Sequence, residues 1–167
     1  GGQGGDTIIG GTGTNIILGD SGMILAASTG AQFGTLPITV GLVQTTAPGI
    51  GGVDHITTGT GGSIVFGGTA GDIIKTDQEL DGTTSTSPNN TNFIFGDDGY
   101  ITWVGTELNP LNLGAELNAS GTWFGADSDS SDIDAVVSTD PSDGGNDQVT
   151  LGAGQAIVVG GQGDDTI

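Results

Sequence analysis

Short clusters of large apolar residues recur along this chain, and glycine-rich stretches separate them. Examples are TIIG, NIIL, SIVF and NFIF. Helices are disfavoured, because glycine costs about 1 kcal/mol per interior helical position relative to alanine. A triplet with a large apolar residue at its centre instead makes a very short strand with one side chain turned inward. The pattern therefore predicts an all-β chain of short strands joined by tight glycine turns.

The clusters belong to blocks of nine or seven residues that follow one plan. Nine-residue blocks include GGQGGDTII at 1–9 and GGTGTNIIL at 10–18, and a seven-residue block reads GGVDHIT at 51–57. Alternating turns and strands wind such a chain into a flattened coil, and stacked coils bury a ladder of Ile, Val and Leu that no single coil could bury alone. One such unit runs over 51–102, with an insertion near 76–90.

The sequence also repeats over a longer period than that of the blocks. The phrase GGQGGDTI at residue 1 returns as GGQGDDTI at residue 160, which is 159 positions later. The segment LVQTTAPGIGGVD at 42–54 also matches AVVSTDPSDGGND at 135–147, at an offset of 93. We therefore expect one period of a tandem array. Its predicted parts are the second half of a solenoid unit at 1–25, connecting loop and strands at 26–50, a full unit at 51–102, a side lobe and connector at 103–143, and the first half of the next unit at 144–167.

The composition excludes several classes of partner. The 167 residues include twenty acids, one Lys or Arg and one His, which gives a net charge of −19. Nucleic acid and anionic membranes should repel this chain, because phosphate binding needs Lys and Arg, whereas cations should be attracted. Disulfides and thiolate metal sites are excluded, because there is no cysteine. Membrane insertion is not expected, since no apolar stretch approaches the length of a membrane span.

GGQGGDTII matches the nonapeptide of RTX-type, or hemolysin-type, calcium-binding repeats at every defined position, and GGTGTNIIL has Asn in place of Asp. The chain thus resembles these repeats, which occur in secreted toxins, enzymes and giant adhesins. The resemblance covers roughly half the residues. It implies a parallel β-roll or β-solenoid, here with inserted side loops, in which Asp and turn carbonyls ligate Ca²⁺. It also implies type I secretion from a bacterium and folding outside the cell.

The acidic positions of the blocks follow a pattern within this expected roll. Consecutive turns of a flattened coil lie on opposite edges, so alternate turns share an edge. One edge carries aspartate throughout, and the other carries uncharged residues (Asn15, Ser63, Asn92 and Ala156). We therefore predict Ca²⁺, which takes about 6–8 oxygen ligands, on the first edge, and a neutral hydrogen-bonded ladder on the second. The predicted metal ligands are Asp6, Asp20, Asp54, Asp72, Asp97, Asp147 and Asp165.

The alternative interpretation is that these aspartates merely hydrogen-bond their own turns, as Asp commonly does. If they bind Ca²⁺, the ions offset the self-repulsion of the acidic chain and stabilise the folded form by mass action. We then expect a chain that is soft at low cytoplasmic Ca²⁺ and rigid outside the cell.

Two regions and one residue stand apart from the blocks. The acidic run at 127–134 begins like an EF-hand loop but lacks the glycine and glutamate of that motif, which favours a solvated loop over an irregular calcium site. The stretch at 101–125 holds both tryptophans and is expected to pack as a side lobe, with a sugar-binding or chain-binding surface as the alternative. His55, the only histidine, is expected to be a surface side chain.

These features favour a structural role without enzyme activity. The leading hypothesis is a calcium-stiffened repeat of a large secreted adhesin, surface fibre or extracellular matrix protein at the cell surface. Neighbouring copies of the same repeat, in a tandem array or an end-to-end filament, are the expected partners. The alternatives are a glycan- or partner-binding module acting through the lobe at 105–135, and a non-catalytic repeat region of a secreted enzyme.

Overall fold

The computed structural model describes residues 1–27, 39–79, 81–86, 90–103 and 133–167. Every regular element in these residues is a strand, so the expectation of an all-β chain is confirmed. The strands form three four-stranded sheets. The chain divides into two compact units, the first made of Gly1–Met23, Gln44–Gly99 and Ser138–Ile167, the second of Ile24–Val43 and Tyr100–Val137.

The first sheet is built from the three-residue strands that the blocks predict. Its strands pair in parallel in the order β1-β5-β7-β11. The middle residue of each triplet points inward, and Ile56, Ile74 and Val149 are almost completely buried. The strands are β1 (Thr7–Ile9), β5 (His55–Thr57), β7 (Ile73–Lys75) and β11 (Gln148–Thr150).

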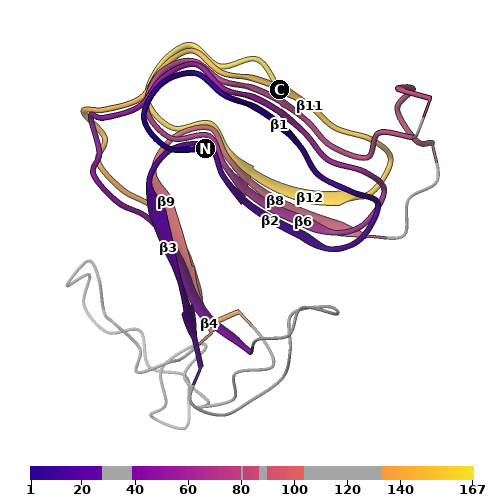
Figure 1. Cartoon of the computed structure of the whole chain (residues 1–167), viewed down its shortest axis with the longest axis horizontal. Coiled ribbons are helices and arrows are strands. Elements are labelled where there is room, and N and C mark those ends of the chain that lie inside the picture. Colours follow the sequence, from indigo (N-terminus) through magenta and orange to yellow (C-terminus); the bar gives the residue numbers. More distant parts are fainter. Residues whose placement is uncertain (28–38, 80, 87–89, 104–132) are drawn as a thin grey trace, which may run out of the picture. The chain divides into compact units, whose positions relative to one another are not determined.

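The second sheet repeats this order with the strands that follow along the chain. It runs β2-β6-β8-β12, again with parallel pairs. Between β5 and β8 the chain therefore alternates between the two sheets, and Figure 1 shows the strands of the second sheet stacked in that order. The strands are β2 (Asn15–Leu18), β6 (Ser63–Phe66), β8 (Thr91–Phe95) and β12 (Gln155–Val159).

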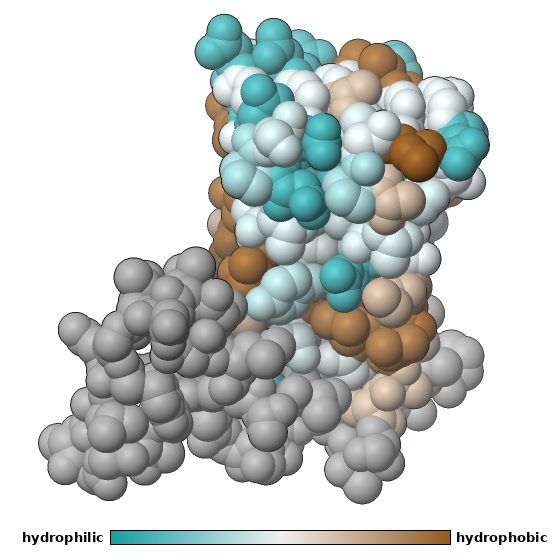
Figure 2. Space-filling model, turned by 90° about the vertical axis from the view of Figure 1, so that its left-hand side faces the viewer, coloured by the Kyte–Doolittle hydropathy of each residue, from teal (hydrophilic) through white to brown (hydrophobic). Residues whose placement is uncertain are grey.

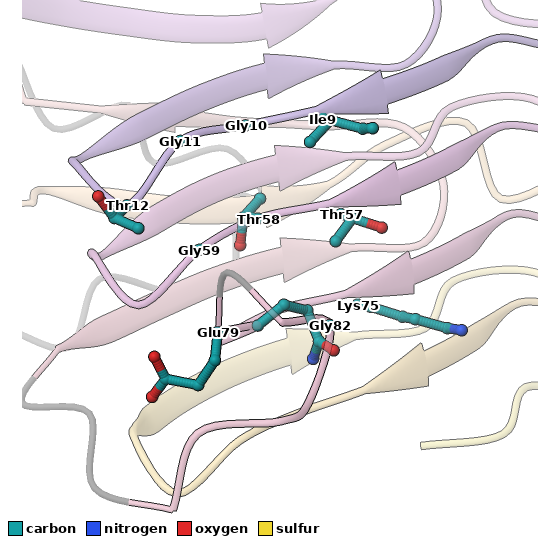
Figure 3. A pocket seen from close by; sticks show the side chains of 11 residues that line it. Ile9, Gly10, Gly11, Thr12, Thr57, Thr58, Gly59, Lys75, Glu79 and Gly82 are labelled. Atoms are coloured by element: carbon teal, nitrogen blue, oxygen red, sulfur yellow. The ribbon is translucent and has the colours of Figure 1, made fainter.

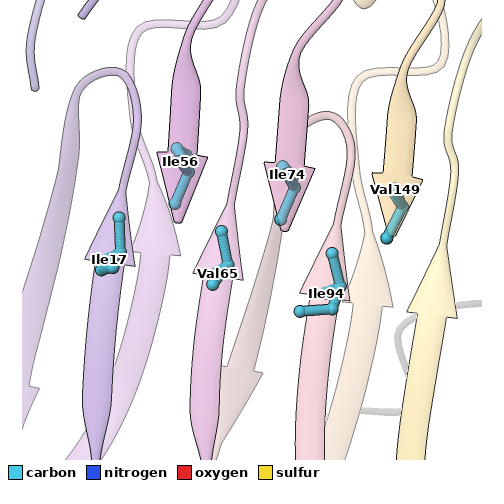
Figure 4. Close-up of a cluster of buried hydrophobic side chains, with 6 residues drawn as sticks. All are labelled: Ile17, Ile56, Val65, Ile74, Ile94 and Val149. Carbon is cyan, nitrogen blue, oxygen red and sulfur yellow. The ribbon is translucent and has the colours of Figure 1, made fainter. Parts of the chain in front are cut away.

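The hydrophobic core lies between these two sheets. Three side chains of the first sheet meet three of the second (Figure 4), and burial of each stabilises the fold by about 1.5–3 kcal/mol. Within the second sheet the rings of Phe66 and Phe95 stack at a centroid distance of 4.4 Å. The core residues are Ile56, Ile74 and Val149 on one side and Ile17, Val65 and Ile94 on the other.

The third sheet, in the order β10-β9-β4-β3, departs from the predicted pattern. The blocks GDSGMIL at 19–25 and GDDGYIT at 96–102 end the predicted solenoid units at 1–25 and 51–102, but their strands belong to this sheet. Hydrogen bonds between β9 and β10 join Asp134 to Thr102 and Thr139 to Asp98, an order that indicates antiparallel pairing. The strands are β3 (Gly22–Ala26), β4 (Val40–Thr45), β9 (Gly99–Thr102) and β10 (Ala135–Ser138).

Several large apolar side chains stay exposed at the outer strands of the two parallel sheets. Ile9 of β1 is 78 % exposed, Ile157 of β12 is 47 % exposed, and Ile167 is 66 % exposed. Figure 2 shows one face of the molecule, on which apolar side chains form separate patches between polar ones. Within the described residues, β1 and β2 at one end of the two sheets and β12 at the other each have an unpaired edge, which favours pairing with further strands.

Candidate metal-binding edge

The turns that follow the strands of the second sheet begin with a glycine that has no room for a side chain. An added Cβ at Gly67 would lie 2.2 Å from Oδ2 of Asp72 and 2.1 Å from the carbonyl oxygen of Gly96 in the next turn. Gly19 and Gly96 are crowded in the same way, each by a carboxylate and by a carbonyl of the following turn. The first glycine of the block is therefore required by the close approach of two oxygens.

Five of the seven predicted ligands form a single column along this edge, which we call the aspartate column. Each stands directly before a residue that pairs in the first sheet. The N–H of Asp54 donates to Oδ1 of Asp72 at 2.7 Å, and bonds of 2.7–3.0 Å join the other neighbouring pairs. These bonds cross from one turn to the next rather than closing a single turn. The column runs in the order Asp6, Asp54, Asp72, Asp147, Asp165.

The second carboxylate oxygen has no partner in the centre of the column. Oδ2 of Asp54, Asp72 and Asp147 is buried and accepts no hydrogen bond from any residue that the structure describes, and these side chains are at most 2 % exposed. An unsatisfied buried acceptor costs about 1–3 kcal/mol, and more when it is charged. Each of these oxygens faces the crowded space beside a turn glycine. A proton or a cation at that position would remove the cost.

Burial raises the pKa of the central carboxyls. Loss of water, together with the nearby carboxylates of Asp147 and Asp54, raises the pKa of Asp72 to about 8. Desolvation also raises the pKa of Asp147 to about 7, and it raises the pKa of Asp54. A bound cation favours the ionised form and would oppose these shifts.

The donors of this edge fit a hard divalent cation such as Ca²⁺, which prefers carboxylate and carbonyl oxygens. In the part of the chain that the structure describes, no three acidic or histidine side chains converge as a ready-made metal group. An ion beside the column would therefore be held by one or two carboxylates and completed by turn carbonyls. The carbonyls next to the column are those of Gly19, Gly67, Gly96 and Gly160.

Asp20 and Asp97, the other two predicted ligands, do not stand in the column. Each lies directly after the crowded first glycine, at the point where the chain leaves for the third sheet. Asp20 accepts the N–H of Gly52, where the chain returns, at 3.3 Å, and that of Thr69 in the next turn at 2.7 Å. Burial raises the pKa of both aspartates to about 6. The equivalent donors to Asp97 are Gly145 and Gln162.

The opposite edge, predicted to be neutral, carries one carboxylate that the sequence pattern missed. The N–H of Ser63 donates to the side chain of Asn92 at 3.0 Å, as expected of an uncharged ladder. Asp77, which is 1 % exposed, accepts hydrogen bonds from the side chains of Asn92 and Asn90. The sequence signal that could have revealed Asp77 is its position at the start of the insertion near 76–90, just after the strand β7.

Two of the predicted regions lie wholly or largely outside the described residues. Residues 127–132 of the acidic loop lie outside the described residues, as does most of the lobe predicted at 105–135. His55 is exposed on β5, so its prediction as a surface side chain is confirmed.

A groove of about 410 Å³ lies over the last residues of β1, β5 and β7 (Figure 3). Its lining combines the hydroxyls of Thr57 and Thr58 with the charged groups of Lys75 and Glu79. In Figure 3 the Lys75 and Glu79 side chains extend in different directions, so they do not form a facing pair. Among the described residues of the lining, Glu79 is the one acid, so no pair of carboxylates like that of a glycosidase-type centre faces the groove, and no lining residue belongs to the aspartate column.

Comparisons with protein-family models, with curated proteins and with solved structures find no match for this chain. Within the described ranges, the chain forms no helix of the length and apolar character that a membrane crossing requires. Its function must therefore be inferred from the site itself.

Proposed function

We propose that the chain is a calcium-stiffened structural repeat of a secreted adhesin, surface fibre or extracellular matrix protein. The observation that carries the proposal is the buried, unpartnered Oδ2 that recurs at Asp54, Asp72 and Asp147. Divalent cations beside these oxygens satisfy them and offset part of the net charge of −19. Because the site exists only in the folded chain, the ions stabilise folding by mass action.

The proposed architecture is a parallel β-roll that repeats along the chain every 159 residues. In support of a repeat, Thr166 pairs with Gln148 at the outer side of β11, and Asp165 continues the aspartate column. The segment 160–167 repeats the sequence of 1–8 with one change, so it stands where the first turn of a following copy belongs. Neighbouring copies of the same repeat are the proposed partners, in a tandem array or an end-to-end filament.

Coupling between Ca²⁺ and folding suits a bacterial protein exported by type I secretion. The chain is soft in the cytoplasm, where free Ca²⁺ is low, and becomes rigid at the cell surface. Its role is that of a spacer and scaffold, without catalysis. No observation on the described residues favours a glycan-binding lobe or an enzyme appendage over this role.

Asp72→Asn tests the proposal at the centre of the column. Asparagine keeps the oxygen that accepts the Asp54 N–H but loses the charge that a cation needs. We expect millimolar Ca²⁺ to raise the Tm of the wild type, chelation to reverse the rise, and Asp72→Asn to lose much of it. Asp81→Asn, which removes the same charge from an exposed position, should keep the full rise. A wild-type Tm that ignores both Ca²⁺ and chelator would contradict the proposal.

A further inference from the structure

Two surface turns of this chain share the same backbone geometry, and the first copy is uncharged. In the turn at 46–50, the N–H of Thr46 donates to the carbonyl of Ser21 at 2.8 Å, and the N–H of Ile50 donates to that of Ala47 at 3.2 Å. Ala47 has a φ of +57°. These two bonds and one left-handed residue define the shape of the turn.

The second copy, at 139–143, has the same backbone but contains two acids, and a third, Asp98, provides the carbonyl to which the turn is hydrogen-bonded. The N–H of Thr139 donates to the carbonyl of Asp98 at 3.0 Å, and the N–H of Asp143 donates to that of Asp140 at 2.9 Å. Asp140 has a φ of +52°. Since the first copy forms this turn without charge, the acids are not needed for its backbone. The three positions read Ser21, Ala47 and Ile50 in the first copy and Asp98, Asp140 and Asp143 in the second.

Asp98 forms the buried member of this acidic triad. Its side chain is only 3 % exposed, and none of the described residues donates a hydrogen bond to Oδ2. The hydroxyl of Thr45 is hydrogen-bonded to the carboxyl group, and the nearby carboxylates of Asp140 and Asp143 add to the effect of burial in raising its pKa. A buried carboxylate with an unsatisfied oxygen strongly destabilises the folded state unless a positive group lies next to it. The only Lys or Arg of the chain, Lys75, is exposed on β7.

We propose that Asp98, Asp140 and Asp143 bind a hard divalent cation, with Ca²⁺ as the reference ion, at a site separate from the aspartate column. Asp98 is the buried ligand at the bottom of the site, and Asp140 and Asp143 cover the ion from the surface side. The three carboxylates do not yet converge on one point, so the exposed side chain of Asp140 turns inward on binding. Every available donor is an oxygen, which selects Ca²⁺ and related hard ions over softer metals.

The uncharged turn at 46–50 provides the residues for a variant of the triad and a position for its control. The triple variant Asp98→Ser, Asp140→Ala, Asp143→Ile installs the residues of the uncharged copy. It should bind one Ca²⁺ fewer per chain than the wild type, as counted by equilibrium dialysis and native mass spectrometry of the full chain. The reciprocal variant Ser21→Asp, Ala47→Asp, Ile50→Asp should bind one Ca²⁺ more. Equal ion counts for all three proteins would overturn the proposal.

A milder variant covers the case in which the triple variant fails to fold, as judged by circular dichroism. Asp143→Asn removes one charge from a half-buried position and should weaken one class of Ca²⁺ site by about tenfold or more, as expected for loss of a charged ligand. Unchanged affinity of every site in this variant would count against the triad. The triad does not depend on the column: if Asp72→Asn leaves Ca²⁺ binding unaltered while the triple variant loses one ion, the triad stands and the column proposal fails.

Discussion

Ala70 holds a backbone angle that the equivalent turns give to glycine. Its φ is +82°, where Gly4 has +98° and Gly163 has +127°. The left-handed region costs an alanine about 1–2 kcal/mol, and the greater freedom of glycine in the unfolded chain cancels about 0.4–1 kcal/mol of that. Ala70→Gly should therefore raise the free energy of unfolding by about 0.5–1 kcal/mol, which corresponds to a Tm increase of about 1–4 °C.

Gly4→Ala is the reverse change at the matching position. A Cβ there meets no atom within 4 Å, so only the backbone cost is introduced and the Tm should fall. Thermal unfolding followed by circular dichroism measures both variants. A lower Tm for Ala70→Gly would show that the methyl contacts of Ala70 outweigh its backbone strain.

The strands of the two parallel sheets could be predicted from the sequence because their information is local. A glycine-rich turn that ends in Asp, followed by a triplet with an apolar centre, fixes both the turn and the inward side chain, as Ile56 and Ile74 show. The third sheet was missed because Asp20 and Asp97 look like ordinary block acids. They occupy the second turn position, which is left-handed in the uninterrupted turn at Gly68, and there the chain leaves for the third sheet.

The two candidate metal sites also differ in whether the sequence alone could predict them. The aspartate column repeats with the blocks, so the pattern found its five members. The triad of Asp98, Asp140 and Asp143 joins residues far apart in sequence, and no short motif contains it. Only the comparison of two turns built on one backbone distinguishes its acids from the other charges of the chain.

The aspartate column predicts an unusual dependence of stability on pH. The folded pKa of Asp72, about 8, and that of Asp147, about 7, both lie above the ordinary value of 3.8. The folded chain therefore binds more protons than the unfolded chain between about pH 4 and pH 8, so the free energy of unfolding falls as the pH rises through this window. Without metal, the Tm should be lower at about pH 8.5 than at about pH 5.5.

Calcium should reduce this pH dependence, because the ion takes the place of the proton and binds best when the carboxyls are ionised. Thermal melts in metal-free buffer and in millimolar Ca²⁺ measure the effect. The double variant Asp72→Asn, Asp147→Asn should show a flatter dependence in metal-free buffer. A wild-type Tm that increases with pH in the absence of metal would contradict the assignment of raised pKa values to the column.

At the scale of the whole molecule, the two parallel sheets grow in one direction, and each adds four strands per chain. Thr166 already occupies the next strand position of the first sheet. With parallel strands about 4.8 Å apart, each further 159-residue period should lengthen a continuous stack by about 19 Å. Separate compact domains of this size would instead add about 40 Å each.

Small-angle scattering and electron microscopy of chains with two, four and six periods in millimolar Ca²⁺ distinguish these increments. An increment near 19 Å that is lost on chelation is expected, because the metal-free column repels itself along the whole stack. An increment near 40 Å would mean that the copies fold as separate domains and that β12 of one copy does not pair with β2 of the next.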